Sequence, residues 1–150
     1  MQNRGSLWIV AFACLAVGCA ALTIEPVDYS WGIESVLPVA PDGAVTAAPR
    51  TLAFNAAPLF RLELGEMPRS GKPVIRVIRN RAGHYFITAP SFKHVYVFTA
   101  GTGRLKLLRN ILVDPDGMKK PAFNQRDPFI QLVNGDRTWM LTEKGISGGN

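Results

Sequence analysis

The sequence predicts a mainly β domain, a small β-sandwich or partly open barrel of about five to seven short antiparallel strands, behind one N-terminal transmembrane or signal-anchor helix and an extended tether. Three observations predict this class. A long apolar run lies near the N-terminus, short runs of alternating or β-branched residues follow residue 58, and two turn sequences join such runs in pairs. We therefore divide the chain into an anchor (1–24), a tether (25–50), a basic β domain (51–145) and a frayed tail (146–150).

The apolar run, LWIVAFACLAVGCAALTI, covers residues 7–24 without a charged side chain. As a helix, a run of this length would rise about 27 Å, close to the ~30 Å of a bilayer's hydrocarbon core. We therefore expect a membrane anchor. Its larger apolar side chains would contact lipid: Leu7, Trp8, Ile9, Val10, Phe12, Leu15 and Leu22.

Charges on the two sides of the anchor predict its orientation. Arg4 and the α-amino group precede it, whereas Glu25, Asp28, Glu34 and Asp42 follow, with no Lys or Arg before Arg50. The positive-inside rule then leaves the N-terminus in the cytoplasm and carries residues 25–150 outside it. The predicted location is a bacterial inner membrane, crossed once, with the domain in the periplasm.

Three fates of the anchor share this orientation. It is retained as a signal anchor, or it is removed after small residues at positions 18–20. In the third case Ala16-Val17-Gly18-Cys19 resembles a bacterial lipobox, and Cys19 is lipidated, although Ala16 stands where such motifs usually carry Leu. That alternative predicts a protein held at the envelope by lipid.

Residues 25–50 contain four prolines and show no sustained period, which predicts the tether. In residues 59–64, LFRLEL, apolar and charged side chains alternate as in a half-buried strand. Further strands are predicted for the β-branched run 73–79 and for residues 84–89. Residues 118–128 show no period, and such a long connection is usually functional or disordered.

Two hairpins are the best-specified parts of the domain. In the first, residues 94–99 and 104–109 flank Ala100-Gly101-Thr102-Gly103, and pairing Thr99 with Arg104 would place Phe98 opposite Leu105. In the second, Asn134-Gly135 predicts a type I′ turn between residues 129–133 and 136–141. That hairpin would gather four apolar side chains on one face: Ile130, Leu132, Trp139 and Leu141.

The net charge of +6 is unevenly distributed, since residues 1–50 carry −2 and residues 51–150 carry +8. A basic domain favours anionic partners, although a basic surface also serves solubility alone. Candidate partner-binding residues are Arg76, Arg79, Arg104, Lys106, Lys119, Lys120, Phe123 and Arg126. If Arg76 and Arg79 lie beside Arg104 and Lys106, the sheet carries a basic patch. Nucleic acid is the weakest candidate, because aromatic and basic residues are not interleaved.

No catalytic, cofactor-binding or metal-binding residues are predicted. Cys14 and Cys19 lie in the apolar run, which leaves the β domain without cysteine. Its two histidines, His84 and His94, do not have the spacing of a helical metal pair. Asp114-Pro115-Asp116-Gly117 is a turn sequence that lacks the further ligands of a calcium loop.

These observations favour a non-enzymatic accessory, scaffold or assembly subunit of a larger bacterial membrane protein complex. Its expected partners are the lipid bilayer and integral membrane or envelope proteins. The alternative is an envelope lipoprotein that binds an anionic ligand or surface through a basic β-sheet face. A third hypothesis, an extracytoplasmic hydrolase, requires His84 or His94 to meet a carboxylate in a cleft.

Overall fold

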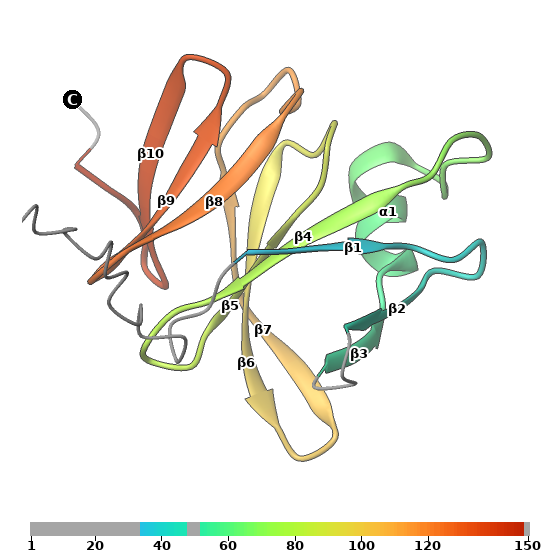
Figure 1. Ribbon diagram of the computed structural model, residues 1–150, viewed down its shortest axis with the longest axis horizontal. Helices are drawn as coiled ribbons and strands as arrows, with labels where there is room; N and C mark the ends of the chain where they lie inside the picture. Colours follow the sequence, from blue (N-terminus) through green and yellow to red (C-terminus); the bar gives the residue numbers. More distant parts are fainter. Residues whose placement is uncertain (1–33, 48–51, 149–150) are drawn as a thin grey trace, which may run out of the picture.

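The computed structural model of the chain describes residues 34–47 and 52–148, which are coloured in Figure 1. This part is mainly β, as predicted, with antiparallel sheets and no closed barrel. It holds eleven strands, more than the expected number, and one helix. The strands are β1 (Ser35–Pro38), β2 (Ala44–Ala47), β3 (Leu52–Asn55), β4 (Val74–Arg79), β5 (Tyr85–Thr88), β6 (His94–Gly101), β7 (Arg104–Leu112), β8 (Pro121–Arg126), β9 (Phe129–Asn134), β10 (Arg137–Thr142) and β11 (Gly145–Ser147), and the helix is α1 (Ala57–Leu64).

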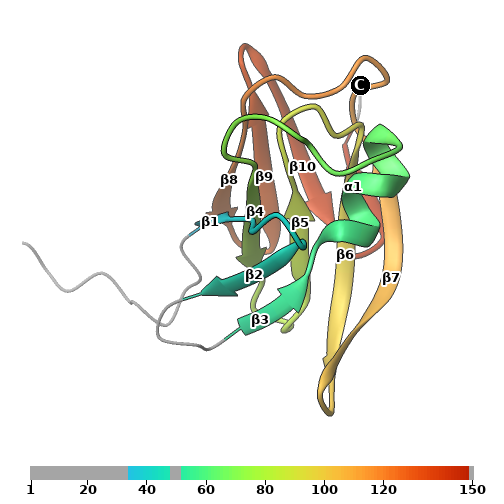
Figure 2. The ribbon, with the colours of Figure 1, turned by 90° about the vertical axis from the view of Figure 1, so that its right-hand side faces the viewer.

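A five-stranded sheet in the order β1-β4-β5-β6-β7 forms the middle of the domain. The four-stranded sheet β11-β10-β9-β8 lies on one side of it, and α1 with the β2–β3 pair lies on the other (Figures 1 and 2). Both faces of the middle sheet are therefore covered, and consecutive residues of β6, Val95, Tyr96 and Val97, are all buried. Fully burying a side chain of this size stabilises the fold by about 1.5–3 kcal/mol.

Helix α1 replaces the strand predicted for residues 59–64, so that prediction is wrong. A proline in the first turn suits a helix start, and Gly65 ends the helix with φ 82°, its N–H donating to the carbonyl of Arg61. The helical period turns Phe60 and Glu63 toward the sheet and leaves Leu62 72% exposed. Phe60 packs edge-on against Phe92, with 5.1 Å between ring centroids.

The predicted tether is wrong for the part that the structure describes, residues 34–47. Strand β1 pairs with β4, and β2 pairs with β3, so these residues belong to the domain. Each of the two strands is four residues long, too short for an alternation to be visible among the prolines. The predicted anchor, residues 1–24, lies outside the described residues.

The first hairpin is confirmed, but its predicted register is wrong. Gly101 pairs with Arg104 across the two-residue turn Thr102-Gly103, so Thr99 lies opposite Lys106. The register then shifts between Val97 and Phe98, whose partners are Arg109 and Leu107, which leaves Leu108 as the extra residue of a β-bulge. Both strands extend beyond their predicted ends.

The second hairpin brings its four apolar side chains together as predicted, since Leu132 pairs with Trp139 and Ile130 with Leu141. The turn residues are Gly135 and Asp136 rather than Asn134 and Gly135. Gly135 has φ 62° at the first central position, as in a type II′ turn. Asn134 is instead buried, and its side-chain oxygen accepts the N–H of Lys120 at 2.9 Å.

Two further segments fold where no strand was predicted. Pro121–Arg126 forms β8 against β9, inside the stretch predicted to be irregular. Gly145–Ser147 forms β11 against β10 and overlaps the predicted frayed tail at residues 146 and 147. Strand β8 carries a single large apolar side chain, Phe123, so its sequence shows no alternation. Among residues 34–47 and 52–148, no helix has the length and apolar character needed to cross a bilayer.

Candidate functional site

The most exposed element of the middle sheet is β7, which pairs with β6 on one side and forms the sheet's edge on the other. Ile111 is its only buried residue, whereas Leu107, Leu108 and Leu112 are 48%, 45% and 52% exposed. We call the outer side of β7, from Arg104 to Leu112, the open edge. Figure 2 shows β7 along the outer margin of the molecule.

The pairing with β6 assigns the side chains of β7 to the two faces of the sheet. Residues paired across antiparallel strands share a face. Arg104, Lys106 and Arg109 lie opposite Gly101, Thr99 and Val97 and therefore share one face. Leu105, Leu107 and Leu112 lie opposite Ala100, Phe98 and His94 on the other face. From Arg104 to Leu107 the open edge is thus basic on one face and apolar on the other, whereas beyond the bulge Asn110 lies on the leucine face and the buried Ile111 on the basic face.

The three basic side chains of this face make no ion pair within the described part of the chain. They are exposed at the end of the hairpin and along β7. Two of them, Arg104 and Lys106, are predicted partner-binding residues, and the structure places them on one face as expected. Arg109 joins them there after the bulge.

The other basic residues of the predicted patch lie elsewhere. Strands β5 and β6 separate β4 from β7, so neither Arg76 nor Arg79 lies beside Arg104. Arg76 forms a 2.7 Å ion pair with Glu34 and is largely buried. The guanidinium of Arg79 lies 5.5 Å from the ring centre of Tyr85. The condition for a continuous basic patch on the sheet is therefore not met.

Residues 118–128 contribute the remaining predicted site residues. Phe123 is 3% exposed and belongs to the core, so it does not fit the prediction of an exposed anchor for a partner. Its position on β8 turns the side chain inward, while the alternate residues Asn124 and Arg126 are exposed. Arg126 Nε lies 3.4 Å from Gln131 Oε1 on the neighbouring strand.

Lys119 and Lys120 line a pocket of about 560 Å³ between the turn at residues 114–117 and the β9–β10 turn. Beside it, the buried carboxylate of Asp114 accepts hydrogen bonds from the side chains of Asn134 and Arg137. The cationic and anionic side chains of the lining are equal in number, so the pocket has no net charge that selects an anionic ligand. The charged residues lining it are Lys119, Lys120, Arg137, Asp114, Asp116 and Asp136.

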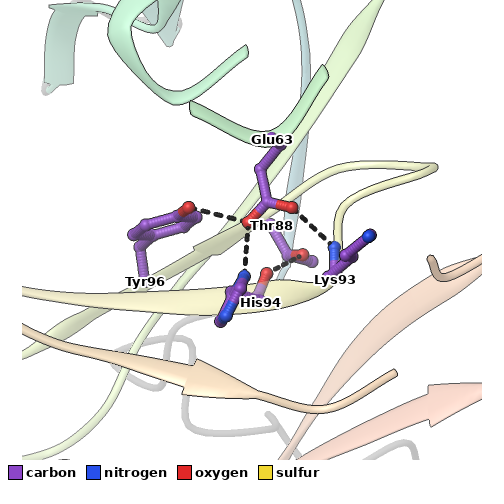
Figure 3. A network of polar contacts seen from close by, with 5 residues as sticks. All are labelled: Glu63, Thr88, Lys93, His94 and Tyr96. Carbon is purple, nitrogen blue, oxygen red and sulfur yellow. Dashed lines mark hydrogen bonds and ion pairs between the residues drawn. The ribbon is translucent and has the colours of Figure 1, made fainter. Parts of the chain in front are cut away.

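A carboxylate on α1 fixes the helix to the sheet beside β7 (Figure 3). The side chain of Glu63 is 2% exposed, and its Oε1 accepts the hydroxyl of Tyr96 at 2.7 Å and lies 2.8 Å from Nδ1 of His94. Its Oε2 accepts the backbone N–H of Lys93 at 2.8 Å, and the Thr88 hydroxyl donates to the carbonyl of His94. Every oxygen of the carboxylate is therefore occupied by a donor from β6 or from the residue preceding it.

Burial, and then the hydrogen bond to Glu63 and its negative charge, raise the pKa of the Tyr96 hydroxyl well above its ordinary value. The hydroxyl thus remains a donor at neutral pH. Sequence reasoning missed Glu63 because it placed residues 59–64 on a strand. Only the helix brings this carboxylate to His94, 31 residues later.

The network meets one requirement of the hydrolase hypothesis, a histidine against a carboxylate, but not the other. The side chain of Glu63 lies between α1 and β6, and the pocket beside residues 114–117 is lined by neither Glu63 nor His94. The nearest hydroxyls, those of Tyr96 and Thr88, are used as donors within the network. The arrangement is that of a structural latch.

No cluster of three or more His, Cys, Asp or Glu side chains that could hold a metal ion occurs in the described ranges. The other histidine, His84, has its Nδ1 buried without a hydrogen-bond partner. Comparison of the chain with protein-family models, with curated proteins and with solved structures found no match. Its function must therefore be inferred from its own geometry, of which the open edge is the most distinctive part.

Proposed function

We propose that the chain is a membrane-anchored, non-enzymatic accessory or assembly subunit of a larger bacterial membrane complex, whose domain outside the cytoplasm binds a partner protein through the open edge. The single observation that carries this proposal is the exposure of β7, a nine-residue edge strand with three half-exposed leucines. The apolar run at residues 7–24 supports the membrane location.

An uncovered strand of this kind is unusual in a soluble protein. Edge strands present unpaired N–H and C=O groups that pair readily with other chains, and most are short, charged, bulged or covered. Strand β7 is long and carries exposed leucines. Their burial against a partner would stabilise the complex by about 25 cal/mol per Å² of apolar area buried. Only its bulge at Leu108 and its basic residues limit indiscriminate pairing. A specific partner strand fits this combination.

Purification of the full-length chain from membranes in mild detergent tests the proposal. Wild-type protein should bring down stable, stoichiometric partners, and Leu107→Lys on the open edge should lose them. Val36→Lys is the matched control, because Val36 lies on the opposite edge strand, β1, and is 47% exposed against 48% for Leu107. A clean wild-type monomer, or equal losses in both variants, would contradict the proposal.

The second candidate function, binding of an anionic ligand by an envelope lipoprotein, is favoured by the cationic face formed by Arg104, Lys106 and Arg109. It predicts binding that weakens steeply with salt and is insensitive to Leu107→Lys, since Leu107 lies on the other face.

Intact-mass measurement distinguishes the two forms of anchor. Retained Met1 supports the signal anchor, and a diacylated Cys19 at the new N-terminus supports the lipoprotein.

A further inference from the structure

We infer that the open edge receives an extended segment of the partner protein in which acidic and apolar residues alternate. This inference rests on the proposed function and specifies the chemistry of the partner. The segment would add to the five-stranded sheet beside β7, with its acidic side chains on the face of Arg104 and Lys106 and its apolar side chains on the face of Leu105 and Leu107.

The alternation follows from the geometry of strand pairing. A residue directly opposite another on an adjacent strand shares its face, and neighbours along one strand point to opposite faces. From Arg104 to Leu107, basic and apolar residues alternate without interruption before the bulge at Leu108. An added strand that is complementary over these four positions therefore needs acidic residues at i and i+2 and apolar residues at i+1 and i+3.

Charge also argues against a second copy of this chain as the occupant. Antiparallel pairing of two β7 strands into a continuous sheet would gather Arg104, Lys106 and Arg109 of both copies on the same face. Like charges in adjacent strands destabilise the pairing. Within the described residues no carboxylate is paired with these cations, so an acidic partner can supply the compensation.

The apolar face gives the same segment a second set of contacts. Leu107 and Leu112 lie on this face, and Leu105 is partly buried against the core. Main-chain pairing supplies affinity in such strand addition, and the alternate side chains supply specificity.

The test uses the full-length chain in uncharged detergent and three fluorescent eight-residue peptides. The first alternates Glu and Val, the second alternates Lys and Val, and the third has four Glu followed by four Val. We expect the alternating Glu–Val peptide to bind at least about tenfold more tightly than either other peptide. The Lys–Val peptide replaces the ion pairs with repulsion, and the block peptide cannot place its acidic residues opposite both Arg104 and Lys106 while its apolar residues face Leu105 and Leu107. Equal binding of the acidic and basic alternating peptides would overturn the inference.

Charge reversal sharpens the test. The double variant Arg104→Glu/Lys106→Glu should prefer the Lys–Val peptide, and Lys119→Glu/Lys120→Glu, which changes two exposed lysines away from β7, should keep the wild-type preference. Thermal melting establishes that each variant is folded, and Arg104→Ala/Lys106→Ala replaces the reversal if that variant does not fold. An unchanged preference in the folded reversal or alanine variant would overturn the inference.

The two proposals fail in different ways. If no peptide binds but Leu107→Lys still loses the partner from membranes, the open edge is a binding site and its acidic specificity is wrong. If Leu107→Lys also keeps the partner, the proposed function fails as well. Crosslinks from position 107 to a second copy, or to residues 25–33 of the same chain, would also contradict the inference.

Discussion

The two edges of the five-stranded sheet differ in length and in proline content, two properties that control pairing with another chain. Strand β1 is four residues long and ends at Pro38, which has no N–H to offer. Strand β7 is nine residues long and contains no proline. The first edge is blunted and the second is open, although both belong to the same sheet.

Glu34, the residue that precedes β1, extends this difference to the second sheet. One oxygen of its carboxylate pairs with Arg76 at 2.7 Å, and the other accepts the N–H of Phe123 at 2.9 Å. Phe123 lies on β8, the edge strand of the four-stranded sheet, so Glu34 occupies a donor that an incoming strand would use. One carboxylate therefore occupies part of the β8 edge and links it to Arg76 on β4.

No carboxylate occupies the edge of β7 in the described ranges, although β11 approaches this strand. Instead, the latch at Glu63 fixes α1 to the face of β6, next to the open edge but not across it. Edge protection in this domain is therefore selective. Selective exposure of one long edge is the reason to assign a function to it.

The largest expected effect is on the latch beside the open edge. Glu63→Ala leaves the Tyr96 hydroxyl and His94 Nδ1 without their acceptor and should lower the free energy of unfolding by about 3 kcal/mol. Glu63→Gln retains one acceptor oxygen and should lose less. Chemical denaturation of both variants measures the difference, and an unchanged midpoint in Glu63→Ala would show that the latch contributes nothing to stability.

A smaller loss is expected on the closed side. Glu34→Ala removes the partner of Arg76 and the acceptor for Phe123 N–H, both partly buried, and should cost about 2 kcal/mol. Because it also uncovers the β8 edge, the variant should self-associate at concentrations where the wild type does not. Sedimentation velocity measures this, and a variant that stays as dispersed as the wild type would show that Glu34 does not protect the edge.

The raised pKa of Tyr96 predicts a loss of stability in alkali. The folded state holds this proton more tightly than the unfolded chain, so the contribution is present below the ordinary tyrosine pKa of about 10 and declines as pH rises above it. Between pH 10 and 11, the wild type should lose about 1 kcal/mol more than Tyr96→Phe. Denaturation curves at the two pH values measure this, and an equal loss of stability in the wild type and in Tyr96→Phe would contradict the raised pKa of Tyr96.

The smallest effect on folding should come from the exposed residues of the two edges. Leu107→Lys and Val36→Lys each replace a side chain that is about half exposed, and each should change the free energy of unfolding by less than about 0.5 kcal/mol. Denaturation of both variants checks this. A large loss in Leu107→Lys alone would mean that the leucine serves packing, and its effect on partner recovery would then have no functional meaning.

Sequence patterns correctly predicted the elements whose conformation is determined by neighbouring residues in the sequence. The β class, β4, β5 and both hairpins follow from β-branched runs and from turn glycines. The alternation in residues 59–64 predicted a strand, but the helix end at Gly65 and the packing of Phe60 against Phe92 show that tertiary contacts select a helix there.

The candidate site could be predicted only in part. Arg104 and Lys106 share a face because a hairpin fixes that relation locally, whereas Arg76 lies three strands away because sheet order depends on distant contacts. The same limit applies to β7. A hairpin sequence predicts that two strands pair, but the position of either strand at a sheet edge depends on what the rest of the chain leaves uncovered.

The most direct test of the open edge is site-specific photocrosslinking of the full-length chain in intact membranes. A photoreactive residue at position 107 should crosslink to a single partner protein, and the same residue at position 36 should not. Equal crosslinking from the two positions, or crosslinking from position 36 alone, would contradict the account of β7 as the binding edge.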